Sequence, residues 1–245
     1  MHPNTRRLRL PDILWFEIPA GTFLYGERKE ARHCDRFWIA KYPVTNAQYQ
    51  TFSYDGGYAD ERWWQDLKRP QPQASHWPQP NRPRTNVDWY EAVAFCRWFT
   101  ARLGLAPGAI RLPTETEWER AARGTDGRAY PWGDDFRPGL ANFDETWDQR
   151  GPWYLKETTA VGVYPQGRSP EGVMDLAGNV WEWCRNRYDE PQNVAIDRGS
   201  ASRVVRGGSW RFDPAGARAD SRNRSHPENR SDPLGFRLCS SVPIS

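Results

Sequence analysis

The chain has 245 residues, and its 34 basic and 31 acidic side chains leave a formal net charge of only +3. Basic and acidic residues are interleaved, which argues against a dedicated nucleic-acid surface, so we expect no nucleic-acid partner. No apolar run approaches the ~20 residues of a membrane span and no signal peptide is evident, so we expect a cytoplasmic chain without a membrane partner.

The N-terminal part of the chain is expected to form a tail followed by β-structure. Residues 1–12 are basic and contain proline, which predicts a tail ahead of the fold. Residues 13–26 (ILWFEIPAGTFLYG) alternate between two faces and Gly21 closes the first run, so this stretch predicts a β-hairpin. Residues 37–45 (FWIAKYPVT) predict a further strand.

Three helices are predicted next, each with its own boundary signals. Thr45 begins the first, with a glutamine three residues later that completes a capping box. The second is expected from about residue 86 and is stopped by a glycine at 104. The third begins at Thr114, which forms a capping box with Glu117, and ends at Gly124.

Residues 125–245 contain no further long helical pattern. Short apolar runs alternate there with glycine, proline and polar residues, which predicts short strands joined by turns. With no linker and no internal repeat, the sequence predicts a single α+β domain over residues 13–245, irregular and rich in loops.

The stretch from Arg206 to Leu238 has two ends that look rigid and a middle that looks permissive. It opens with RGGSW and closes with LGFRL, whereas the residues between them are mainly small or polar and show no hydrophobic period. Variable segments between fixed ends are typical of a binding loop on a scaffold.

Six motifs occur in a fixed order along the chain: KYPVTNAQY (41–49), RLPTETEWERAARG (111–124), YPWGD (130–134), DLAGNVWEWCRNRY (175–188), RVVRGGSW (203–210) and GFRL (235–238). This succession resembles the formylglycine-generating enzyme (sulfatase-modifying factor) family, and it covers the chain from about residue 13 to 240. The resemblance implies a C-type lectin fold of the formylglycine-generating enzyme type, which agrees with the irregular α+β prediction.

The resemblance also implies a structural calcium ion, which oxygen ligands from carboxylates and turn carbonyls would suit. The ligands would be two acidic side chains and three carbonyl groups: Asp175, Glu182, Leu176, Gly178 and Val180. The alternative is a turn that Asn179 and the two acids satisfy.

The catalytic residues that the resemblance implies are absent from this sequence. The family's enzymes oxidise a substrate cysteine with two cysteines and a copper ion, which thiolates bind well. These two positions fall on or near Phe212 and Ala217. A related branch uses iron held by three histidines, and the four histidines here show no such spacing. We therefore expect no enzyme activity and no catalytic cofactor.

The four cysteines offer no substitute chemistry. They are far apart and none belongs to a CxxC pair, which argues against a zinc site and predicts free, mostly buried thiols: Cys34, Cys96, Cys184 and Cys239. An active copper-dependent formylglycine-generating oxidase acting on a sulfatase cysteine stays as the alternative.

The same fold has a second known use, in variable proteins of diversity-generating retroelements. These carry hypervariable residues between a GGSW-type start and a GFRL-type end, and their diversified codons do not reach Lys, Gln, Glu, Met or Trp. Between Arg211 and Pro233 the chain has none of these except Glu228. The resemblance thus implies a variable binding segment over residues 211–233.

The candidate ligand-binding positions in this segment all lie within the reachable set of amino acids: Arg211, Phe212, Asp213, Ser221, Asn223, Ser225, His226, Ser231, Asp232 and Pro233. Arginines and a proline between them are expected to be fixed: Arg218, Arg222, Arg224, Pro227 and Arg230.

The sequence therefore predicts a non-catalytic, ligand-binding domain. We expect a protein surface as the ligand rather than a sugar, because the EPN and QPD triplets of calcium-dependent sugar binding are absent. A sensor or effector module of a larger bacterial system is a further alternative, and so is a plain solvated loop over 211–233. The sequence indicates neither the identity of the ligand nor the oligomeric state.

Overall fold

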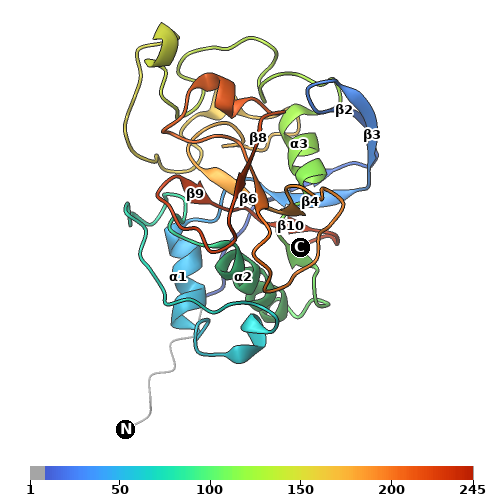
Figure 1. Ribbon diagram of the computed structural model, residues 1–245, viewed down its shortest axis with the longest axis vertical. Coiled ribbons are helices and arrows are strands. Elements are labelled where there is room, and N and C mark those ends of the chain that lie inside the picture. Colours follow the sequence, from blue (N-terminus) through green and yellow to red (C-terminus); the bar gives the residue numbers. More distant parts are fainter. Residues whose placement is uncertain (1–8, 245) are drawn as a thin grey trace.

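A computed structural model of the chain describes residues 9–244 and shows an irregular α+β fold (Figure 1). The helices are α1 (Asn46–Tyr54), α2 (Trp89–Arg102) and α3 (Glu115–Arg123), with four 3-10 turns, η1 (Glu61–Trp64), η2 (Trp147–Gln149), η3 (Pro165–Gly167) and η4 (Pro214–Ala217). The strands are β1 (Trp15–Ile18), β2 (Gly21–Tyr25), β3 (Glu30–Cys34), β4 (Phe37–Ala40), β5 (Ile110–Arg111), β6 (Trp181–Arg187), β7 (Arg203–Arg206), β8 (Arg222–Ser225), β9 (Leu234–Gly235) and β10 (Cys239–Ser240). Most of the predicted N-terminal tail lies outside the described residues.

The helix boundaries follow from capping signals in the sequence. The Thr45 and Thr114 hydroxyls cap α1 and α3 in complete capping boxes. The cap of α2 is Asp88, whose carboxylate accepts a hydrogen bond from the Glu91 backbone N–H at 2.8 Å. The three predicted helices are confirmed, although α2 begins at residue 89 rather than at 86.

The predicted hairpin over residues 13–26 is wrong. β1 pairs antiparallel with β4, in a sheet of order β1-β4-β10-β5. β2 pairs instead with β3 in a separate two-stranded ribbon, near a turn at Gly26, whose φ of 70° suits glycine. The sequence did not reveal β3 because its residues (EARHC) are mostly polar and exposed, so they carry no apolar alternation.

A third sheet, of order β8-β7-β6-β9, holds the stretch from Arg206 to Leu238. β8 pairs antiparallel with β7 at one edge, and β9 pairs parallel with β6 at the opposite edge (Figure 1). Residues 222–225 were expected to be loop because they lack a hydrophobic period. They form an exposed edge strand, which backbone pairing alone can hold.

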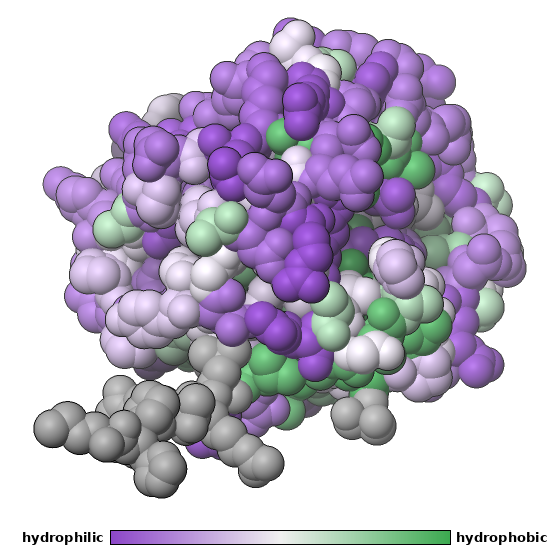
Figure 2. Space-filling view, turned by 90° about the horizontal axis from the view of Figure 1, so that it is seen from below, coloured by the Kyte–Doolittle hydropathy of each residue, from purple (hydrophilic) through white to green (hydrophobic). Residues whose placement is uncertain are grey.

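Aromatic side chains fill the interior between the helices and the sheets. The largest fully buried side chains include four tryptophans, Trp89, Trp98, Trp118 and Trp183. α1 and α2 lie side by side below the sheets (Figure 1), where Tyr49 stacks on Phe95 with ring centroids 5.6 Å apart. The face seen from below is mainly polar, with a few apolar patches (Figure 2). No described helix is long and apolar enough to cross a membrane.

Candidate functional site

The resemblance places the catalytic cysteines on or near Phe212 and Ala217. Both of these residues have hydrocarbon side chains, and they lie in contrasting settings. Phe212 is 39% exposed and packs edge-on against Trp181, with ring centroids 5.6 Å apart. Ala217 is fully buried against Gly208. A Cβ added to Gly208 would lie only 2.9 Å from the Ala217 Cα. Neither side chain provides a metal ligand or a nucleophile.

All four cysteines are free and buried, as predicted. Burial raises the pKa of the Cys34 and Cys96 thiols to about 12. It raises the pKa of Cys184 and of Cys239 well above the usual value for a thiol. Thiols held in the protonated form are poor nucleophiles and poor metal ligands. Within residues 9–244, no three His, Cys, Asp or Glu side chains gather as a metal ion would require.

The residues around Glu182 do not fit the calcium site that the resemblance implied. Arg237 donates from Nε and Nη2 to the two carboxylate oxygens of Glu182, each at 2.6 Å, and the Trp118 indole N–H donates to one of them at 2.7 Å. Arg237 Nη2 also donates to the carbonyls of Met174 and Asp175. The guanidinium thus supplies the positive charge that calcium was expected to supply.

The other implied calcium ligands are also engaged with protein groups or buried. The Asp175 carboxylate accepts a hydrogen bond from the Gly162 N–H at 2.7 Å, and burial raises its pKa to about 6. The Gly178 carbonyl accepts from the Val180 N–H at 2.9 Å. The side chain of Leu176 is fully buried in a hydrophobic cluster. The two acids and the Gly178 carbonyl therefore each have a protein partner.

An aromatic cluster surrounds the start of the segment 211–233. Trp210 lies at its centre, with the ring of Trp77 edge-on at 5.3 Å and the ring of Tyr154 stacked at 6.3 Å. Phe212 and Trp181 continue the cluster beside it. We refer to these five residues as the aromatic cluster. The indole N–H of Trp210 is buried and has no hydrogen-bond partner among the described residues.

Both ends of the segment reach the aromatic cluster. Arg211 is exposed and its guanidinium lies 5.8 Å from the Trp210 ring centroid. Asp232 lies 4.0 Å from His76, which packs against Trp77. The structure therefore brings Arg211 and Asp232 to the same aromatic cluster, although they are 21 positions apart in the sequence.

Three other candidates near the cluster are held by structural contacts. Pro233 is buried and its carbonyl accepts a hydrogen bond from the Trp181 N–H at 2.7 Å. The Ser231 carbonyl accepts from the Asn86 N–H at 3.2 Å. Asp213 caps η4 through a hydrogen bond from the Gly216 N–H at 2.9 Å. Their side chains are half-buried or buried, so they are less available to a ligand than Arg211 and Phe212.

The remaining candidates form a separate group at the β8 edge of the sheet. Asn223 and Ser225 are on β8, Ser221 precedes that strand and the exposed His226 follows it. Because β7 and β6 lie between β8 and β9, this group does not adjoin the one at the aromatic cluster. The ten candidates thus occupy two surfaces rather than one.

Arginines that the sequence predicted to be fixed anchor the segment to buried acids. Arg222 donates from Nε to Glu115 at 2.8 Å, and Glu115 also pairs with the buried Arg206 at 3.0 Å. Arg230 Nη2 lies 2.9 Å from Glu91, which is fully buried at the start of α2. These ion pairs hold the backbone of the segment independently of its outward side chains.

Asp88 and Glu91 form a buried acid pair beneath Arg230. Arg230 Nε lies 3.6 Å from Asp88, and the Tyr58 hydroxyl donates a hydrogen bond to Glu91. Desolvation, with the charge of Glu91 beside it, raises the pKa of Asp88 to about 7, and Arg230 only partly opposes this effect. Desolvation raises the pKa of Glu91 too. Folding therefore favours the protonated form of Asp88.

Asp88→Asn is expected to remove a loss of stability that occurs as the pH rises. Folded Asp88 keeps its proton up to about pH 7, whereas the unfolded chain releases it near the ordinary value of 3.8. The free energy of unfolding therefore falls as the pH rises from about 4 to about 7, and the loss persists above that range. Asn still caps α2 but does not titrate. Urea titrations measure the free energy of unfolding of the variant and of wild type at about pH 4 and at about pH 7. Between these two pH values, the difference should shift in favour of the variant by at least about 1 kcal/mol. A pH-independent difference would contradict a protonated Asp88.

Sequence reasoning missed two members of the aromatic cluster. Trp77 lies in the irregular excursion before α2 and Tyr154 in the long loop after α3, and neither was singled out. Trp181, which packs against Phe212, is also a member of the buried core. The available signal was an aromatic residue in each of two polar, proline-rich or glycine-rich loops, since such aromatics need a packing partner.

Residues 2–242 match the sulfatase-modifying factor enzyme 1-like domain family. The chain belongs to this family. It is 37% identical over 292 residues to the inactive C-alpha-formylglycine-generating enzyme 2 of Mus musculus, covering 94% of this chain and 87% of the relative. It is 34% identical over 237 residues to the hercynine oxygenase of Mycobacterium tuberculosis, covering 82% of this chain and 52% of the relative. The chain thus spans about half the length of the hercynine oxygenases it matches.

Solved structures share the fold of this family member. Treponema denticola variable protein 1 superposes with a TM-score of 0.70 at 23% identity, covering 93% of this chain and 95% of that one. The structure of CarF superposes with a TM-score of 0.69 at 23% identity, covering 95% and 99%. These matches confirm the predicted α+β fold of the formylglycine-generating enzyme and C-type lectin type.

Proposed function

We propose that the protein is a non-catalytic binding domain that displays residues 211–233 on a C-type lectin scaffold, like a variable protein of a diversity-generating retroelement. One observation carries the proposal: the exposed Phe212 of the aromatic cluster and the buried Ala217 occupy the places on or near which the resemblance puts the catalytic cysteines. The inactive relative at 37% identity supports the same reading. So does the fold shared with a variable protein.

The ligand that we propose is a protein surface that contacts the aromatic cluster. Aromatic residues and arginine are the usual anchors of protein interfaces, and the exposed Arg211 and Phe212 stand at the cluster. The unpartnered indole N–H of Trp210 is a donor that a small rearrangement on binding would offer to an acceptor. His76 and Asp232 add polar groups at the margin.

The anchoring arginines explain how such a segment tolerates change. Arg222 and Arg230 bind buried acids, so the backbone position does not depend on the outward side chains. Exchanges of exposed residues away from caps and core usually alter stability by about 0.5 kcal/mol or less. Under this proposal Arg211, Phe212 and Asn223 are free to vary, whereas the two arginines are not.

The retroelement part of the proposal is tested in the DNA beside the gene. A near-copy of the segment encoding residues 211–233 should lie there, with mismatches concentrated at template adenines and a reverse-transcriptase gene nearby. The codons of Arg222 and Arg230 should match between the two copies. A flanking sequence without such a repeat would contradict diversification, while leaving a fixed binding surface as the function.

The non-catalytic part is tested by metal binding and turnover. We expect the purified protein to bind less than about 0.1 equivalent of Cu(I), because its four thiols are buried and protonated. A peptide of the CxPxR type should keep its thiol on incubation with the protein and oxygen, and iron should not change this outcome. Binding of one equivalent of copper with loss of the peptide thiol would establish the oxidase instead.

A further inference from the structure

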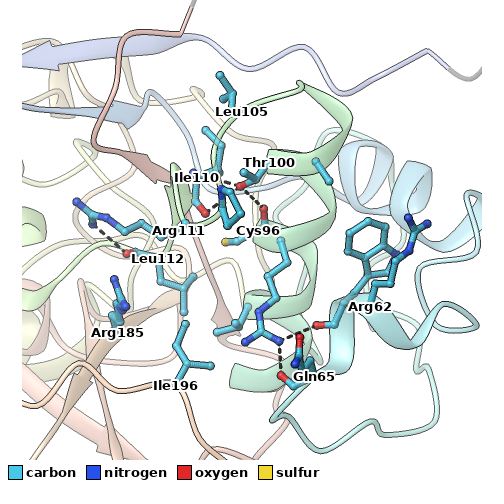
Figure 3. A pocket seen from close by; sticks show the side chains of 16 residues that line it. Arg62, Gln65, Cys96, Thr100, Leu105, Ile110, Arg111, Leu112, Arg185 and Ile196 are labelled. Carbon is cyan, nitrogen blue, oxygen red and sulfur yellow. Dashed lines mark hydrogen bonds between the residues drawn. The ribbon is translucent and has the colours of Figure 1, made fainter.

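A separate apolar cavity of about 480 Å³ lies between α2, η1 and the chain that follows α2 (Figure 3). Its walls include the side chains of Trp63, Val93, Cys96, Ile110, Leu112 and Ile196. No residue of the segment 211–233 lines it. Small-molecule sites are typically concave, mostly apolar and of ~300–1,000 Å³, so the space suits a small ligand.

Three of the four arginines around this cavity are engaged with protein groups. Arg62 pairs with Asp60 at 2.5 Å, and Arg111 pairs with Glu117 at 2.6 Å. Arg97 donates from Nη1 to two carbonyls of the η1 region, including that of Trp63 at 3.2 Å. These three cations are therefore at least partly satisfied without a ligand.

Arg185 is the exception. It belongs to β6, and Figure 3 shows it on the same side of the cavity as Arg111, opposite Arg62. Its Nε donates to the Val194 carbonyl at 2.9 Å. Within residues 9–244 no carboxylate forms an ion pair with it, and its two Nη groups have no hydrogen-bond partner.

The setting of Arg185 disfavours an unpaired charge. Burial lowers the pKa of its guanidinium, and the like charge of Arg111 adds to that effect. The Nη groups of Arg185 are not among the buried atoms without a partner, so they reach solvent and are accessible to an anion. A planar guanidinium with two free Nη groups is shaped for a carboxylate, which it binds with two parallel hydrogen bonds.

We propose that this cavity binds a small organic carboxylate with an apolar body. The carboxylate pairs with the Nη groups of Arg185, and the hydrocarbon lies along Val93, Cys96 and Leu112. The Arg185 guanidinium and the apolar walls belong to one cavity, and recognition of an amphipathic anion requires both. The site is independent of the binding surface proposed for residues 211–233.

Calorimetry with decanoate and with the uncharged decan-1-ol tests this assignment. Wild type should bind one equivalent of decanoate, and more weakly one of decan-1-ol. Arg185→Gln should weaken decanoate binding about tenfold or more and leave decan-1-ol unchanged, because only the charged hydrogen bonds are lost. Arg28→Gln, at an exposed position between β2 and β3, should change neither.

Two further variants keep the test decisive if Arg185→Gln unfolds, as thermal melting would show. Ala101→Phe fills the cavity from an exposed position of α2 and should reduce binding of both ligands. Arg185→Lys keeps the charge and should retain the preference for decanoate. The assignment is overturned if wild type does not bind decanoate, if binding exceeds one equivalent without saturating, or if Ala101→Phe or Arg185→Gln leaves it unchanged.

Discussion

Arg237→Met is expected to lower the free energy of unfolding by about 3–5 kcal/mol. Arg237 is fully buried, and its guanidinium neutralises Glu182 through two hydrogen bonds of 2.6 Å. It also satisfies the carbonyls of Ala40 and Met174, which join β4 to the turn before β6. Methionine leaves a buried carboxylate without a cation. Urea unfolding followed by tryptophan fluorescence measures the loss.

Matched variants separate the charge from the loss of a large side chain. Arg28→Met, at an exposed site, should change stability by about 0.5 kcal/mol or less. Adding Glu182→Gln to Arg237→Met should recover part of the loss, because the uncompensated charge is then gone. A cost below about 1 kcal/mol for Arg237→Met would contradict the role given to the pair. A loss restored by calcium would show that the ion replaces the guanidinium.

Gly178→Ala is expected to cost about 2–4 kcal/mol, from backbone strain and overpacking together. Gly178 has a φ of 72°, and a Cβ there would overlap the carbonyl oxygen of Asn142 and approach the Phe143 ring at 2.9 Å. Its N–H donates to the Gly207 carbonyl at 2.7 Å, so the turn joins three segments close to the start of the segment 211–233. Thermal and urea unfolding measure the effect.

Gly104→Ala is the matched control for the steric part of this cost. Gly104 follows α2 with a φ of 67°, but no atom lies within 4 Å of a Cβ placed there. It should therefore cost only the strain of positive φ, about 1 kcal/mol. Equal losses of unfolding free energy in the two variants would mean that the backbone near Asn142 moves aside. The close approach of the Asn142 carbonyl would then not be the reason for a glycine at position 178.

Local signals in the sequence were sufficient for the helices. Thr45 and Thr114 cap α1 and α3 in capping boxes. Such a start can be predicted locally, because the capping hydroxyl and the acid or amide that completes the box are within four residues of each other. The ordered motifs were also sufficient for the family and the fold, since they span nearly the whole chain. The absence of cysteines on or near Phe212 and Ala217, where the resemblance implies them, was visible in the sequence too.

Strand partners were not available from the sequence. β1 and β2 are neighbours along the chain yet belong to different sheets, and β8 carries no apolar pattern that would mark it as a strand. Pairing depends on which backbone edge is left open after the core has packed. That is a property of the whole molecule and not of a short window of residues.

The candidate site shows the same division between local and tertiary information. The sequence by itself determined that residues 211–233 form a polar segment between two rigid motifs, because composition and the fixed ends are local properties. Only the tertiary structure decided that Arg211 stands by Trp210 while Asp232 stands by His76, the neighbour of Trp77 in the same cluster, whereas Asn223 lies at the other edge of the sheet. It also decided that Arg237, 55 residues after Glu182, neutralises that acid. Contacts between distant segments form only when the aromatic core packs them together, and no spacing along the chain encodes that distance.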